Sequence, residues 1–349
     1  MAVDAGDGGE GIEAALRRAR YAPDRADFDR LLALLDDPDV EPEVRRRVLR
    51  ALASVPVEYA AALSSAVPAL ADRLDDERTR RQYAVRALAR VAAADPDAVR
   101  PAVDGLVDCL DDRNHWVRSG AAEALGTAFA ADPAGVEATF DRLDRATPEV
   151  RGTVVDLLAS VAAVHPVAVA PAAPRLRELF VDRRHRRGRV LAALEPLAAH
   201  DPSLAVPVAP TLRTVLAESD DPETRRRALS TLAAVARVAP DAVDPAVAHV
   251  GAALRDDDES VRRAAVDVLL ELLPQRPAST ETVARLVRQA GYWERVRATR
   301  LLADEFADAV LADPLFVSLL GAEGWYVRRP VLRALAARHD EYGSPCERF

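Results

Sequence analysis

Residues 256–272 read DDDESVRRAAVDVLLEL, and this stretch contains the pattern that decides the fold. Its apolar residues recur at i, i+3, i+4, i+7, i+8 and i+11: Val261, Ala264, Ala265, Val268, Leu269 and Leu272. Such spacing places them on one side of a helix, so the stretch predicts an amphipathic helix with one face in a core. The preceding aspartates predict a turn.

The same pattern recurs along the chain when the sequence is aligned on the arginine at position 262. The aligned arginines are separated by 36, 37, 33, 36, 38, 37, 35 and 31 residues: Arg45, Arg81, Arg118, Arg151, Arg187, Arg225, Arg262, Arg297 and Arg328. Seven residues after the arginine comes a leucine in every unit but the eighth: Leu52, Leu88, Leu125, Leu158, Leu194, Leu232, Leu269 and Leu335. Fifteen residues after it comes a proline in six consecutive units: Pro96, Pro133, Pro166, Pro202, Pro240 and Pro277. Three constraints at one period indicate an internal repeat.

Each repeat predicts two helices and no strand. The proline ends the helix that begins near the arginine, because proline cannot continue a helix. A second amphipathic run follows, such as residues 99–110, and several of these runs contain an early proline that predicts a first turn or a bend. These early prolines are Pro101, Pro171, Pro207 and Pro245. A chain of 349 residues would suggest two to three domains, but the unbroken repeat predicts one elongated domain over 25–340. Residues 1–24 are expected to be an acidic tail and capping segment, and 341–349 a C-terminal tail.

The repeat resembles the HEAT repeat family in its aspartate turn, its Val-Arg pair at the start of the second helix and its Ala-Ala-x-x-Leu stripe. The resemblance implies an all-α fold, a right-handed α-solenoid of about nine helix pairs, in which each pair contacts only its neighbours. It also implies a ladder of turn aspartates and phased arginines, often joining neighbouring repeats. Four arginines follow an aspartate by six residues: Asp39 and Arg45, Asp75 and Arg81, Asp112 and Arg118, and Asp256 and Arg262.

The composition excludes several kinds of chemistry. The chain has no lysine, so all 47 basic residues are arginine, and 56 acidic residues bring the net charge to -9. Without lysine there is no Schiff-base enzyme and no P-loop, whose lysine must reach the nucleotide phosphates. The lysine-free, acidic composition favours a salt-adapted, haloarchaeal source, with a bacterium of high GC content as the alternative.

No motif for catalysis, a metal or a cofactor stands out, so we expect none of the three. The two cysteines, Cys109 and Cys346, match no disulfide or metal pattern and fit a reducing cytosol. None of the six histidines is followed by glutamate, which removes the His-Glu ligands of HEAT-type di-iron hydroxylases. No apolar segment is long enough for a membrane span and residues 1–11 lack the features of a signal peptide, so we expect a cytoplasmic protein.

The densest charge lies at residues 182–189, DRRHRRGR, near the middle of the repeats. Its arginines are candidates for binding a partner: Arg183, Arg184, Arg186, Arg187 and Arg189. Other arginine clusters share the same phase, so stacking would align them in a ridge along one edge of the helices. The ridge has two interpretations. It either binds phosphates or an acidic partner segment, or it is a solvated arginine–aspartate ladder that joins the repeats.

Aromatic residues gather just before the phased arginine, although only 5% of the chain is aromatic. They are Trp116, Trp293 and Trp325, with Tyr292 and Tyr326 beside two of them. The structural interpretation is packing between the ends of adjacent helices. The functional one is that Trp116, Trp293, Trp325 and Tyr326 anchor a partner, since Trp, Tyr and Arg dominate interface hot spots.

The leading functional hypothesis is therefore a non-catalytic scaffold that binds cytosolic proteins along the groove of a solenoid, through an acidic or helical segment of the partner. The alternative is nucleic-acid binding through the arginine ridge, because aromatic residues beside arginines resemble the HEAT-like DNA glycosylases. No catalytic aspartate of that group can be assigned, and the acidic net charge opposes it. A second alternative is a protein resembling the bilin lyases, whose repeats are shorter than most of those here.

Overall fold

The computed structural model describes residues 7–37, 39–76, 78–145, 147–182 and 187–272, together with Arg329 and Leu332. Throughout these residues the chain is helical, with turns between the helices and no strand. The predicted all-α fold is therefore confirmed. The chain divides into two compact units, Met1–Arg175 and Leu176–Phe349, which are described separately.

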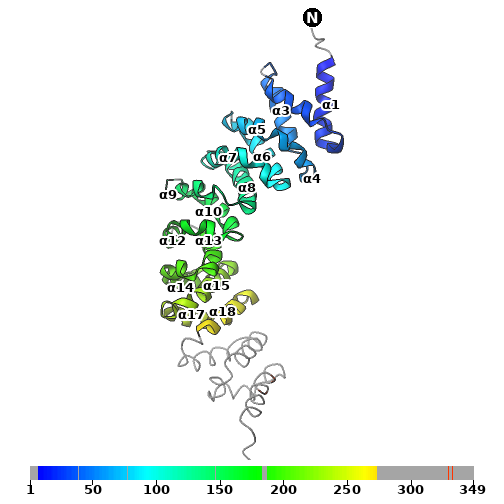
Figure 1. The fold of residues 1–349 in the computed structure, drawn as a ribbon. Helices are drawn as coiled ribbons and strands as arrows, with labels where there is room; N and C mark the ends of the chain where they lie inside the picture. The colour runs from blue at the N-terminus through cyan, green and yellow to red at the C-terminus, as the bar shows by residue number, and fades with distance from the viewer. Residues whose placement is uncertain are drawn as a thin grey trace, which may run out of the picture. The chain divides into compact units, whose positions relative to one another are not determined.

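The phased arginines begin a series of single, uninterrupted helices, which we call the second helices. In the first unit they are α3 (Pro42–Leu52), α6 (Arg78–Ala94), α8 (His115–Ala131) and α10 (Pro148–Ala162). In the second unit they are α13 (Arg187–His200), α15 (Pro222–Val238) and α18 (Glu259–Leu272). Within each unit every second helix packs against the next one, as Figure 1 shows. The eighth and ninth arginines, Arg297 and Arg328, lie outside the described residues.

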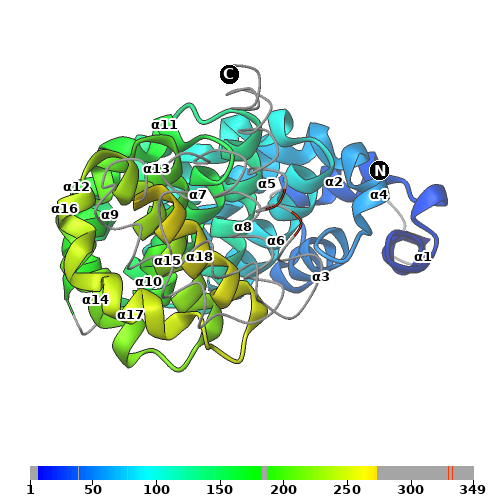
Figure 2. The same ribbon diagram turned by 90° about the horizontal axis from the view of Figure 1, so that it is seen from below.

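The segments between the second helices, which we call the first helices, are divided into short α-helical and 3₁₀ pieces. The first unit has α2 (Phe28–Asp36), α4 (Val57–Ala60), η2 (Ala61–Ala66), α5 (Val67–Ala71), η3 (Asp72–Asp75), η4 (Pro96–Ala102), α7 (Val103–Cys109), η5 (Val136–Thr139), α9 (Asp141–Arg145), α11 (Pro166–Val169) and η6 (Ala170–Ala172). Helix α12 (Ala173–Val181) contains the boundary between the units. The second unit has η7 (Pro202–Val208), α14 (Ala209–Glu218), α16 (Pro240–Val243), η8 (Asp244–Ala246) and α17 (Val247–Ala253). In the second unit, Figure 2 shows α14, α16 and α17 outside α15 and α18.

Proline explains where these elements begin and bend. Pro96, Pro202 and Pro240 each stand at the start of a first helix, where the missing N–H costs nothing. The early prolines all lie in the 3₁₀ pieces, which shows that they mark bends within the first helices. The residue before the proline often caps the new helix: Asp95 Oδ1 accepts from the N–H of Ala98 at 3.3 Å.

The core lies between the two layers of helices in each unit. All seven phased leucines of the described repeats are essentially fully buried: Leu52, Leu88, Leu125, Leu158, Leu194, Leu232 and Leu269. The larger core residues Phe129 and Phe180 come from α8 and α12. The repeat leucine is thus the most regular contribution to a core that continues from one repeat to the next.

Part of the N-terminal segment folds as a helix. Residues Asp7–Tyr21 form helix α1, followed by the 3₁₀ piece η1 (Pro23–Arg25). Helix α1 packs against α2 and α3 and buries Ala15, Leu16 and Ala19. The apolar residues of this helix thus cover the exposed side of the first repeat, as a capping segment would.

Burial makes Cys109 chemically inert, which leads to a prediction. The thiol lies at the end of α7, and burial raises its pKa to about 12, against the lowering effect of nearby Arg81. In a Cys346→Ser background we expect Cys109 to react with a thiol reagent at pH 8 on the order of a hundredfold more slowly than an exposed thiol, and fully after unfolding in guanidinium. Rapid stoichiometric labelling of the native protein would contradict this placement.

Candidate protein-interaction face

The phased arginines are bound first to the turn that precedes their own helix. Arg118 donates to the carbonyl oxygens of Asp112 at 2.9 Å and Arg113 at 3.1 Å. Arg262 does the same with the carbonyl oxygens of Asp256 at 2.8 Å and Asp257 at 3.0 Å. The structure thus brings together the predicted pairs Asp112–Arg118 and Asp256–Arg262, but through the carbonyl oxygen of each aspartate.

The carboxylates of the same aspartates bind the arginine of the preceding repeat. Arg225 donates from Nε and Nη2 to both carboxylate oxygens of Asp256, at 2.8 and 2.9 Å. Arg81 likewise reaches the next repeat, where its Nη1 donates to one carboxylate oxygen of Asp112. Donating hydrogen bonds to the Asp256 carboxylate raises the pKa of Arg225. Although burial acts to raise it, the pKa of Asp256 is lowered by the Arg225 hydrogen bond. One aspartate therefore ties two neighbouring repeats together.

The other two predicted pairs are not formed. Arg45 donates to the carbonyl oxygen of Asp37 at 2.7 Å and not to Asp39. Arg81 uses the carbonyl oxygen of Asp76 at 3.0 Å in place of the carboxylate of Asp75. The acceptors lie eight and five residues before the arginine, so a fixed separation of six residues did not identify them.

The first helices have a ladder of their own that sequence reasoning missed. Arg142 contacts Asp108 and Asp111 of the preceding repeat, both at 3.0 Å. Arg175 contacts Asp144 at 2.7 Å and Asp141 at 3.4 Å, again one repeat earlier. Arg142 and Arg175 thus bind aspartates of the preceding repeat, whereas the phased arginines Arg81 and Arg225 bind an aspartate of the following repeat. The signal was an arginine that follows an aspartate by 31 to 34 residues, a separation that only the repeat makes meaningful.

Only part of the predicted arginine cluster lies in the described chain. Arg183, Arg184 and Arg186 lie outside the described residues. Arg187 begins α13 and is paired with Glu218 at 3.8 Å, and Arg189 is exposed on the same helix. The aromatic candidates Trp293, Trp325 and Tyr326 also lie outside the described residues.

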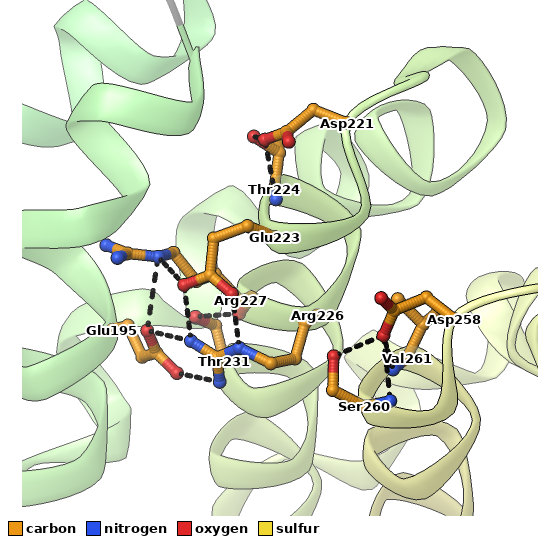
Figure 3. Close-up of polar contacts among 10 residues, drawn as sticks. All are labelled: Glu195, Asp221, Glu223, Thr224, Arg226, Arg227, Thr231, Asp258, Ser260 and Val261. Carbon is orange, nitrogen blue, oxygen red and sulfur yellow. Dashed lines mark hydrogen bonds and ion pairs between the residues drawn. The ribbon is translucent and has the colours of Figure 1, made fainter.

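On the second helices of the second unit, arginine charge is neutralised by glutamate (Figure 3). Arg226 binds both carboxylate oxygens of Glu195, on the preceding second helix, at 3.0 and 3.2 Å. It also binds Glu223 at 2.8 Å, while Arg227 donates to Glu223 at 2.7 Å. The hydrogen bond from Arg226, together with that from Arg227, lowers the pKa of Glu223 to about 2. The four side chains form one compensated network.

This network predicts a loss of stability in acid. The ordinary pKa of a glutamate is 4.5, so Glu223 favours folding fully above that pH, and its contribution disappears as the pH falls toward 2. In thermal melts between pH 7 and pH 2, we expect the melting temperature of Glu223→Gln to fall less than that of the wild type below about pH 4.5. Parallel curves for the two proteins would contradict the network.

The second helices of the first unit expose a different set of residues. We call this set the second-helix face of the first unit: the exposed residues Arg46, Arg50, Arg86, Trp116, Ser119, Glu123, Asp156 and Ser160, together with the half-buried Arg90. Trp116 is 62% exposed in the first turn of α8, where the Asn114 side chain accepts its backbone N–H at 3.2 Å. The ring of His115 lies against it, with 4.3 Å between ring centroids. The N-cap therefore holds a large aromatic side chain at the surface.

The described residues contain no group of three potential ligands placed to hold a metal ion. None of the helices in the described part of the chain is both long enough and apolar enough to cross a bilayer. The Nε2 of His165 donates to the carbonyl oxygen of Ala130 at 2.8 Å and so joins two repeats.

Comparison with known proteins places the fold in the α-solenoid class. A family model described as HEAT-like repeat matches residues 78–128, which comprise α6, the first helix η4–α7 and most of α8. The match covers one repeat of the chain, and the other second helices repeat the spacing of its arginine and leucine. No curated protein matches it.

Three solved structures illustrate the likeness. A structure whose title concerns a phosphorylation switch in the interaction of cadherin with β-catenin is 15% identical, with a TM-score of 0.61 over 97% of this chain and 74% of that one. A crystal structure of an engineered protein is 23% identical, with a TM-score of 0.47 over 63% of this chain and 97% of that one. A designed armadillo repeat protein is 21% identical, with a TM-score of 0.42 over 70% of this chain and 98% of that one.

Proposed function

We propose that this protein is a non-catalytic scaffold that binds other proteins through the second-helix face of its first unit. The observation that carries the proposal is the exposure of Trp116 on a face that also has arginines without acidic partners among the described residues. Tryptophan and arginine contribute more than other residues to the energy of interfaces. The repeat supports this function, because stacked helices present one extended surface across several units.

The test is site-specific cross-linking with the full-length protein. A photoreactive amino acid at Ser119, on the face, is compared with one at Glu137, which is exposed on the first-helix side. In a lysate of the native host we expect discrete protein adducts from position 119 and not from position 137. The adduct is then identified, and the purified partner must bind saturably to the wild type. Equal labelling at both positions, or adducts whose purified protein does not bind, would contradict the proposal.

A further inference from the structure

The positive charges of the first unit are unequally compensated. Arg46 is paired with Glu43 at 2.6 Å, and Arg47 with Glu13 of α1. Arg50, Arg86 and Arg90 have no carboxylate partner among the described residues. They differ in this from Arg226 and Arg227 on the second helices of the second unit, which are compensated by Glu195 and Glu223. These three side chains are available to a ligand.

The fold places the three arginines on one surface. Helix α6 is covered on two sides by α3 and α8, and on a third by η4 and the short pieces α4 and α5. Its remaining side is a stripe that contains Arg86 and Arg90, one helical turn apart. Arg50 and Arg86 both lie five residues after the phased arginine, so they occupy equivalent positions on neighbouring helices.

The same register limits the positive region on the next helix. The equivalent position in α8 is Glu123, which is exposed and has no cationic partner among the described residues. Trp116 lies on this stripe of α8, two turns toward its N-terminus. Positive charge on α3 and α6 is therefore followed by a negative charge and an aromatic side chain on α8.

We propose that Arg50, Arg86, Arg90 and Trp116 form a docking site for an acidic segment of a partner protein. This inference rests on the proposed function and specifies the chemistry of the partner. Guanidinium groups bind carboxylates through paired hydrogen bonds. Trp116 supplies the apolar contact that an isolated charge patch lacks.

The observations favour a protein segment over a nucleic acid. A polyphosphate chain that crosses from α6 to α8 meets the carboxylate of Glu123, and the whole protein is acidic. A protein segment can present acidic residues to α3 and α6 and other side chains to α8. Neighbouring helices lie about 10 Å apart, and an extended chain advances about 3.3 Å per residue. We therefore expect acidic residues at intervals of about three along the segment.

The test is to select binding peptides from a random library with the full-length protein as bait. The peptides have about twelve residues, which is enough to cross three helices. The charge-reversed variant Arg50→Glu/Arg86→Glu/Arg90→Glu is compared with Arg213→Glu, which reverses an exposed arginine of α14 without an acidic partner among the described residues. The wild type is expected to enrich peptides with spaced acidic residues. Reversing the three arginines should lower the affinity for these peptides at least tenfold, and Trp116→Ala should lower it severalfold. Arg213→Glu should change the affinity less than twofold.

Fluorescence polarisation measures the affinities, and circular dichroism confirms that each variant is folded. Enriched peptides without excess acidic residues, or equal binding to the charge-reversed variant, would overturn the proposal. So would tighter binding of a thymidine oligonucleotide than of any enriched peptide, because that result assigns the arginines to phosphate. If the Ser119 cross-link persists when the three arginines are reversed, the scaffold function stands and the acidic-segment inference fails. If neither experiment detects binding, both fail.

Discussion

Replacing Leu88 by alanine is expected to lower the free energy of unfolding by about 2–5 kcal/mol. Leu88 is fully buried in α6, between the layers of second and first helices. The substitution removes apolar contacts and leaves a cavity that the neighbouring helices close only in part. Urea unfolding followed by circular dichroism measures the change as a lower midpoint.

The matched control is Val167→Ala, at a site that is 66% exposed in α11. Its effect should stay within about 0.5 kcal/mol, because surface substitutions rarely change stability. Since each repeat contacts only its neighbours, the Leu88→Ala defect should also make unfolding less cooperative, which a broader transition would reveal. Equal midpoints for the two variants would contradict the repeat core.

Replacing Asp256 by alanine is expected to cost about 1–3 kcal/mol, less than a fully buried pair would cost. The side chains of Arg225 and Asp256 are 18% and 12% exposed, and their two hydrogen bonds join α15 to the turn before α18. Without the carboxylate, the partly buried guanidinium keeps its bond to the carbonyl oxygen of Ser219 but loses its counter-charge.

The control is Arg263→Ala, which removes an ion pair to Glu259 on the same helix. Both side chains of that pair are more than half exposed, so the change should be about 0.5 kcal/mol or less. A double-mutant cycle with Arg225→Ala isolates the coupling between Arg225 and Asp256. A coupling energy no larger than that of the exposed pair would show that the ladder does not join the repeats.

The candidate site illustrates how far sequence reasoning reaches. Trp116 could be selected from the sequence, because its position before the phased arginine recurs and aromatic residues are scarce. Arg86 and Arg90 were not selected, although no acidic residue lies within four positions of either, whereas Glu223 lies three and four positions before Arg226 and Arg227. The second acidic partner of Arg226 is beyond local reasoning, because Glu195 lies 31 residues before it and contacts it only after the helices stack. Local charge density pointed instead to residues 182–189, where Arg187 proves to be paired with Glu218.

The sequence alone determined the helical repeat, its phase and the leucines of its core, because helix formation and amphipathicity depend on residues a few positions apart. It could not determine which oxygen each arginine binds, since Arg45 and Arg81 donate to the carbonyl oxygens of Asp37 and Asp76 and not to the carboxylates of Asp39 and Asp75. Nor could it show that Arg50, Arg86 and Arg90 remain uncompensated. Those outcomes depend on distances of a few ångströms between side chains of neighbouring repeats, so only the packed structure decides where the surface keeps its positive charge.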